Sequence, residues 1–69
     1  MQIKINGKPE ETQETTLLGL LKSKDIEPRM VSVELNSKML DRSSLEQTPI
    51  QEGDEIEFLY FMGGGSTRF

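Results

Sequence analysis

The stretch that organises the chain is Glu57-Phe58-Leu59-Tyr60-Phe61-Met62-Gly63-Gly64-Gly65-Ser66-Thr67-Arg68-Phe69. Its first half is apolar and aromatic, which is typical of a strand. Three glycines follow, and strands avoid glycine because it packs no side chain and loses much backbone freedom on ordering. We therefore expect a folded domain over residues 1–62 and a flexible Gly-rich tail over residues 63–69. A tail without Cβ atoms can enter a narrow channel; an ordinary frayed end or linker is the alternative interpretation.

Size and composition exclude several classes of function. The chain has 69 residues, which allows one domain with one small core. It has neither cysteine nor histidine, so thiol chemistry and the commonest general base and metal ligand are missing. The net charge of −4 argues against nucleic acid, and it fits either a partner protein with a basic surface or solubility alone. We expect no membrane contact and a cytoplasmic location, because no membrane-length apolar run and no signal-peptide pattern occur.

The first residues predict a β-hairpin. Ile3 and Ile5 alternate with polar residues, as in a half-buried strand. Asn6-Gly7 follows, and this pair is the strongest short hairpin signal because a type I′ turn needs positive φ at both central positions. We expect the second strand to run through Pro9 to Glu14 at an edge of the sheet, because proline cannot donate a hydrogen bond to a neighbouring strand.

A helix and a second hairpin follow. Thr15 and Thr16 are candidate N-caps for a helix whose leucines recur at helical spacing. These leucines are better explained as the cover of the sheet than as a docking face. Residues 30–36 alternate again, and the Asn36-Ser37 pair predicts a turn into a short strand over residues 38–40. Ile50 is the apolar anchor of the loop that leads to the last strand.

The last strand changes character along its length. Its alternation predicts that Ile56, Phe58 and Tyr60 point inward. Leu59 and Phe61 then lie on the same face as Glu55 and Glu57, which we expect to be exposed to solvent. We expect Leu59 and Phe61, with the adjoining Met62, to form a patch that docks a partner. The alternative is a central strand covered on both faces.

The order of elements predicts an α+β fold. Two strands, one helix, two further strands and a last strand suit a mixed sheet of four to five strands covered on one face by one main helix. The chain shows no internal repeat and no second domain.

The same residues carry a resemblance to a known family. The chain resembles the ThiS-like sulfur carrier proteins of the ThiS/MoaD family, which have the ubiquitin-like β-grasp fold. The resemblance extends from Met1 to Gly65 and rests on the order and spacing of several segments. These segments are Ile3-Lys4-Ile5-Asn6-Gly7, Leu17-Leu18-Gly19-Leu20-Leu21, Val31-Ser32-Val33-Glu34-Leu35-Asn36, Asp41-Arg42, Gly53-Asp54-Glu55-Ile56-Glu57 and Phe61-Met62-Gly63-Gly64-Gly65.

The resemblance implies a carrier rather than an enzyme. By resemblance, the Gly65 carboxylate is adenylated by an E1-like enzyme of the ThiF/MoeB type and then becomes a thiocarboxylate, while Gly63 and Gly64 thread the partner's channel. ATP and Mg²⁺ would be used by that partner, and this chain would bind no cofactor or metal. The sulfur acceptor in thiamine synthesis would be thiazole synthase. Carriers for amino-acid or molybdopterin synthesis are alternatives.

The last four residues depart from the family pattern. With Ser66-Thr67-Arg68-Phe69 attached, Gly65 has a peptide bond in place of a carboxylate, and activation there is impossible. Three explanations stay open. A peptidase removes residues 66–69, these residues are not native to the protein, or the chain is a β-grasp interaction module that docks without carrying sulfur. A ubiquitin-like protein modifier is a further alternative.

We expect no catalytic site in this chain. Asp41-Arg42 is the one polar pair of interest, and adjacent residues on a loop more often make local contacts than perform chemistry. Glu10, Glu11 and Glu14 could be interpreted as a cation site, although a solvated sheet edge explains them better.

Overall fold

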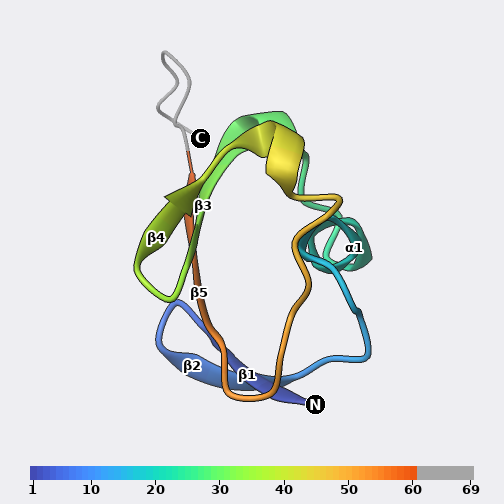
Figure 1. Cartoon of the computed structure of the whole chain (residues 1–69), viewed down its shortest axis with the longest axis vertical. Coiled ribbons are helices and arrows are strands. Elements are labelled where there is room, and N and C mark those ends of the chain that lie inside the picture. The colour runs from blue at the N-terminus through green and yellow to red at the C-terminus, as the bar shows by residue number, and fades with distance from the viewer. Residues whose placement is uncertain (61–69) are drawn as a thin grey trace.

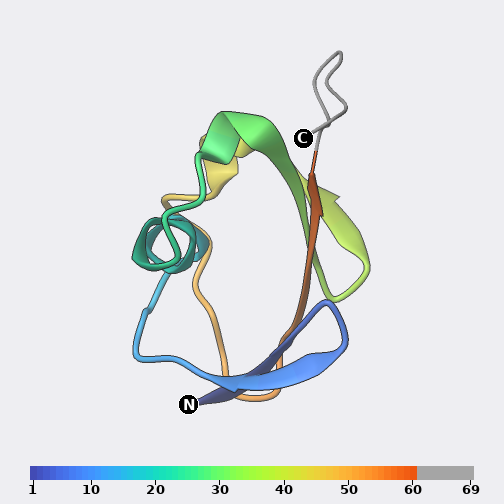
Figure 2. The ribbon, with the colours of Figure 1, turned by 180° about the vertical axis from the view of Figure 1, so that it is seen from behind.

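The computed structural model describes residues 1–60 of the chain. Five strands form one sheet in the order β2-β1-β5-β3-β4, and one helix lies across one face of that sheet (Figures 1 and 2). β1 and β5 are parallel, whereas the other neighbouring strands are antiparallel. The predicted α+β fold with a mixed sheet and one main helix is therefore confirmed. The strands are β1 (Gln2–Ile5), β2 (Lys8–Glu11), β3 (Val31–Leu35), β4 (Lys38–Leu40) and β5 (Glu55–Tyr60).

Both hairpins turn at an asparagine, as the sequence predicts. Asn6 and Gly7 have φ values of 51° and 84°, and Asn36 and Ser37 have values of 51° and 73°. Positive φ at both central positions is the requirement of a type I′ turn. Asparagine meets it more easily than most residues because its short polar side chain tolerates the left-handed conformation.

The edge position of β2 is confirmed, but its predicted end is wrong. β2 ends at Glu11 rather than Glu14. The Thr12 hydroxyl accepts a hydrogen bond from the Glu14 N–H at 3.1 Å, and this local turn directs the chain away from the sheet toward the helix.

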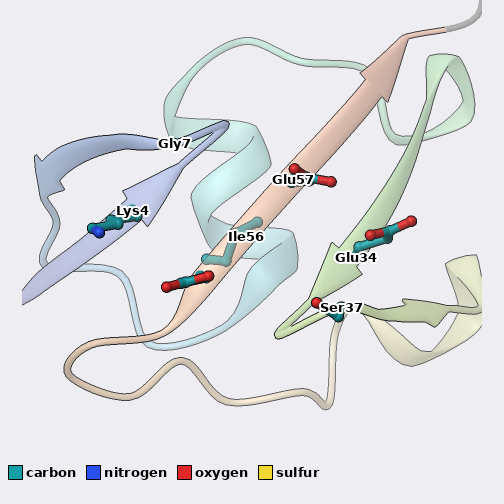
Figure 3. Close-up of a pocket in the computed structure, with 7 residues that line it drawn as sticks. Lys4, Gly7, Glu34, Ser37, Ile56 and Glu57 are labelled. Atoms are coloured by element: carbon teal, nitrogen blue, oxygen red, sulfur yellow. The ribbon is translucent and has the colours of Figure 1, made fainter.

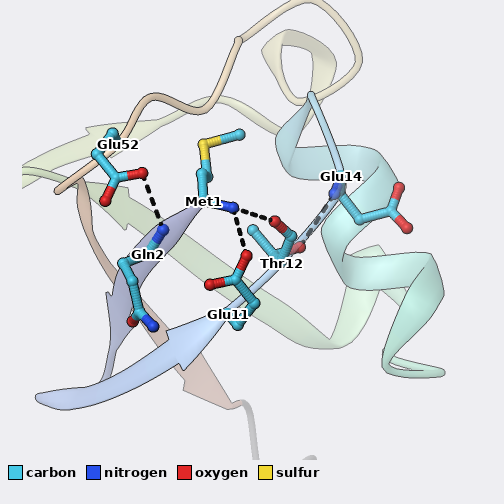
Figure 4. Close-up of polar contacts among 6 residues, drawn as sticks. All are labelled: Met1, Gln2, Glu11, Thr12, Glu14 and Glu52. Carbon is cyan, nitrogen blue, oxygen red and sulfur yellow. Dashed lines mark hydrogen bonds and ion pairs between the residues drawn. The ribbon is translucent and has the colours of Figure 1, made fainter.

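Contacts of the first two residues join the start of β1 to neighbouring segments (Figure 4). The Met1 amino group donates to the Glu11 carboxylate at 2.6 Å and to the Thr12 carbonyl oxygen at 2.9 Å. The Gln2 N–H donates to the Glu52 carboxylate at 3.0 Å. The start of β1 is thereby fixed both to the end of β2 and to the loop before β5.

The helix α1 (Leu17–Ser23) begins at a threonine cap. Thr16 is the N-cap, and its hydroxyl accepts a hydrogen bond from the Gly19 N–H at 3.1 Å. This confirms Thr16 as the cap and satisfies one of the N–H groups that a helix start leaves free. Leu17, Leu20 and Leu21 are almost fully buried against the sheet, so the leucines form the core face as expected.

Two short 3₁₀ helices, η1 (Pro28–Met30) and η2 (Arg42–Ser44), complete the described chain. The loop after η2 contributes Leu45 and Ile50 to the core, which confirms the predicted anchor Ile50. Its backbone joins the start of the helix, since the Leu17 N–H donates to the Thr48 carbonyl oxygen at 3.1 Å. The whole core consists of Ile3, Ile5, Leu17, Leu20, Leu21, Val31, Val33, Leu45, Ile50, Ile56 and Phe58.

Candidate docking site at the end of the last strand

β5 lies in the middle of the sheet and leads toward the glycines (Figure 1). It pairs with β1 through Lys4–Glu55 and Ile5–Ile56, and with β3 from Leu35–Ile56 to Val31–Tyr60. β1 therefore stops alongside the first part of β5, whereas β3 accompanies it to its described end. The last residues of β5 have a neighbouring strand on one side only.

The first part of β5 is fastened by the two turn asparagines. The Asn6 side chain accepts a hydrogen bond from the Phe58 N–H at 2.8 Å and donates to the Phe58 carbonyl oxygen at 3.5 Å. The side-chain amide of Asn6 thus makes the hydrogen bonds to Phe58 that the backbone of a longer β1 would make. Asn36 acts similarly at the strand's beginning, because its side-chain oxygen accepts from the Glu55 N–H at 2.9 Å and its amide donates to Asp54 at 3.1 Å.

Leu59 is exposed on the sheet face away from the helix. It lies opposite Ser32 on β3, and 46% of its surface is accessible. The predicted exposure of an apolar side chain at this position is confirmed. Its role in docking stays a prediction.

The predicted inward direction of Tyr60 is confirmed, but the side chain is not buried. Tyr60 lies opposite Val31 on the helix side of the sheet, yet 56% of its surface is accessible. The buried side chains of β5 are Ile56 and Phe58. At Tyr60 the strand has passed the end of β1. The side chain therefore points to the helix side of the sheet but is not covered by other side chains. Both faces of β5 are consequently apolar and exposed at its described end.

The other predicted site residues lie outside the described residues. These are Phe61 and Met62 of the docking patch, Gly63 and Gly64 of the threading tail, and Gly65 as the reactive position. The boundary between a domain at 1–62 and a tail at 63–69 lies there too.

The remaining polar candidates make local contacts. Glu10 pairs with Lys24, and Glu11 pairs with the Met1 amino group. The Asp41 carbonyl oxygen accepts from the Ser44 N–H at 2.9 Å, and Arg42 donates to the Pro28 carbonyl oxygen at 3.3 Å. Within residues 1–60, no group of three acidic side chains is arranged to hold a metal ion. None of the helices described is long and apolar enough to cross a bilayer.

Sequence similarity extends from these strands through the glycines. The model of the ThiS family matches residues 2–65, which is nearly the whole chain. The chain belongs to the ThiS family. The match includes all three glycines of the 63–65 segment and ends immediately before Ser66.

A solved structure of a ThiS-family protein has the same fold. The chain is similar to the thiamine biosynthesis protein ThiS from Geobacter metallireducens, with 38% identity and a TM-score of 0.81. The likeness covers 94% of this chain and 100% of that one. The ThiS-type β-grasp fold expected from the resemblance is therefore confirmed.

Two curated relatives are much longer proteins. The chain is 39% identical over 66 residues to a thiazole synthase from Magnetococcus marinus, and 34% identical over 69 residues to one from Paramagnetospirillum magneticum. These matches cover 94% and 99% of this chain. The chain therefore spans only 20% and 21% of the length of these two relatives.

The side-chain bridge from Asn6 to Phe58 was not predicted from the sequence. Asn6 was interpreted as a turn residue only, and the turn itself explains an asparagine there. The sequence carried no separate signal for it, because Asn-Gly is already a preferred pair for a type I′ turn.

Proposed function

We propose that this ThiS-family protein is a sulfur carrier, and not a catalyst, whose working group is the carboxylate of Gly65. The observation that supports this most is the family match, which runs through Gly63, Gly64 and Gly65 and ends there. The exposed apolar Leu59 and Tyr60 support it too, because they lie on the strand that leads to these glycines. The reactive carboxylate requires hydrolysis of the Gly65–Ser66 peptide bond, and we assign this step to a peptidase.

The chemistry follows from the weakness of a carboxylate as an electrophile. In the first step the Gly65 carboxylate attacks the α-phosphorus of ATP, which gives a Gly65 acyl adenylate and pyrophosphate. In the second step a sulfide displaces AMP, which leaves a Gly65 thiocarboxylate. A partner of the ThiF/MoeB type would supply the ATP and Mg²⁺ site. The chain lacks cysteine, so no side-chain thiol could carry the sulfur instead.

We propose thiazole synthase as the sulfur acceptor. The two longer relatives support this, since both are thiazole synthases and each match covers nearly the full length of this chain. The role of this protein would be to dock through Leu59 and its surroundings and to present the thiocarboxylate. Three residues reach only about 10 Å when extended, so the folded body must dock closely for Gly65 to enter a buried site.

The decisive experiment compares two forms of the chain. A form ending at Gly65 and the chain ending at Phe69 are each incubated with a ThiF/MoeB-type enzyme, ATP and Mg²⁺, and pyrophosphate release is measured. We expect release only with the form ending at Gly65. Addition of a sulfide source should then give a product whose intact mass shows one oxygen replaced by sulfur. Equal release from both forms, or none from either, would contradict activation at Gly65.

A second function is supported by Ser66-Thr67-Arg68-Phe69. A chain that keeps these residues cannot be adenylated at Gly65, so it could act only as a docking module. Intact mass of the protein from its native cells separates the two functions. Under sulfur-demanding growth, a carrier ends at Gly65, whereas a docking module retains Phe69.

A further inference from the structure

The outer face of the sheet, opposite the helix, carries two facing glutamates. Glu57 on β5 and Glu34 on β3 are directly opposite each other in the antiparallel register. Their chain neighbours Val33, Ile56 and Phe58 are buried, so the two carboxylates point away from the core (Figure 3). Facing side chains on one sheet face have Cβ atoms about 5 Å apart, and like charges at such positions destabilise a sheet.

Within residues 1–60, neither Glu34 nor Glu57 forms an ion pair with a cationic side chain. The ion pairs among residues 1–60 use Glu10, Glu11 and Glu27, and none of them involves Glu34, Glu55 or Glu57. Lys4 lies opposite Glu55 in the register, but it forms no ion pair there. The fold alone therefore gives no reason for acids at positions 34 and 57, where threonine or a Glu–Lys pair would suit the sheet better.

These glutamates line an open hollow on the outer face, together with Lys4. Its volume is about 190 Å³. That is below the roughly 300–1,000 Å³ of ordinary small-molecule sites. The carboxylates around it do not converge as metal ligands do. An elongated cation suits spread carboxylates better, since a guanidinium has five donors in a planar fork and can reach two carboxylates at once.

We propose that this acidic hollow, lined by Glu34, Glu55, Glu57 and Lys4, receives an arginine or lysine side chain of the adenylating partner. The inference rests on the proposed function for the identity of that partner. Charge complementarity selects the partner's basic residue. The hollow adjoins the proposed docking residue Leu59, because Leu59 follows Glu57 by two residues and lies on the same face of β5. The apolar contact at Leu59 would then be bordered by the charged residues of the hollow, and protein interfaces commonly have such a polar rim.

The test is a charge reversal that separates docking from stability. In a chain ending at Gly65, Glu57→Lys creates a favourable pair with Glu34, so the melting temperature should rise. The same change should raise the KM for the carrier and the Kd for the enzyme by about tenfold or more, with kcat unchanged, because it places like charges at the interface. Glu34→Lys is the reciprocal variant and should behave in the same way.

The matched control is Glu46→Lys. Glu46 is exposed, lies in the loop after η2 and makes no ion pair among the described residues. It changes the net charge by the same amount, so any general effect of charge appears in both variants. The KM of the wild-type carrier and of Glu46→Lys should rise with added salt, and that of Glu57→Lys should rise less.

Direct binding keeps this inference distinct from activation at Gly65. Binding of the enzyme without ATP is measured by calorimetry for all variants. If Glu57→Lys and Glu46→Lys bind with the same Kd, or if the wild-type chain does not bind the enzyme, the acidic hollow has no such role. If the wild type binds but releases no pyrophosphate, activation at Gly65 is wrong, and the Kd values still decide the role of the hollow.

Discussion

The two parts of β5 share one strand and have opposite surroundings. From Glu55 to Phe58 the strand is held on both sides, by β3 on one and by β1 and the Asn6 amide on the other. At Leu59 and Tyr60 only β3 accompanies it. Ile56 and Phe58 are 1% and 4% accessible, whereas Leu59 and Tyr60 are 46% and 56% accessible.

We propose that the two parts of the strand have different roles. Its first part seals the core, and its apolar residues contribute to the free energy of unfolding. Its second part, Leu59-Tyr60, has no charged residue but contributes little to the core, so its composition needs another explanation, and partner docking is the one we propose. Substitutions in the two parts should therefore differ in kind: core substitutions lower stability, and substitutions at the end lower binding.

The largest effect is expected at Phe58. Phe58→Ala leaves a cavity under the sheet and should cost about 3–5 kcal/mol of unfolding free energy, which is close to the whole stability of a domain this small. We expect the variant to be largely unfolded at 37 °C in urea and thermal melts followed by circular dichroism. Phe58→Leu, which should still fold, gives a measurable midpoint.

Tyr60→Ala is the matched aromatic control for Phe58. Because Tyr60 is largely exposed, its removal should cost less than about 1 kcal/mol. Equal losses for Phe58→Ala and Tyr60→Ala would show that the two parts of β5 do not differ as described.

A smaller effect is expected at Asn6, which holds the boundary between the two parts. Asn6→Gly keeps the positive φ of the turn but removes the amide that bridges to Phe58. The loss of a part-buried hydrogen bond and the free Phe58 N–H should cost about 1–2 kcal/mol. Hydrogen exchange of the Phe58 amide should accelerate more than that of other amides in β5.

Asn36→Gly is the control for Asn6→Gly. Its hydrogen bond to the Glu55 N–H is exposed, so water can replace the lost amide. We expect a cost below about 1 kcal/mol. Unchanged exchange at Phe58 in Asn6→Gly would mean that the bridge does not fasten the strand.

The local alternation of apolar and polar residues, with the turn residues, was sufficient to predict most of the fold. Ile3 and Ile5, and likewise Ile56 and Phe58, alternate with polar neighbours, and this alternation reports the face of a strand directly. It does not report whether anything covers that face, so the exposure of Tyr60 on the inward face could not be predicted. Leu45 lies in a loop without periodicity, so no pattern indicated its burial.

The candidate site was less predictable because it depends on contacts between distant parts of the chain. Asn6 and Phe58 are separated by 52 positions, and neither suggests the other. The opposition of Glu34 and Glu57 follows from the β3–β5 register, which the sequence leaves open. Leu59 was predictable because it is an apolar residue on the exposed face of the strand, where Glu55 and Glu57 precede it.

The smallest effect on stability is expected at Leu59. Leu59→Thr retains a residue that favours strands and removes the exposed apolar surface, so the free energy of unfolding should stay within about 0.5 kcal/mol of the wild type. The affinity for the adenylating enzyme should fall by about tenfold, the effect of removing a well-placed apolar contact of about 1.4 kcal/mol. Met30→Thr is the control, since Met30 is similarly exposed at 47% but lies in η1, off the sheet. If Leu59→Thr unfolds the protein, or if both variants bind the enzyme as the wild type does, the end of β5 is not a docking surface.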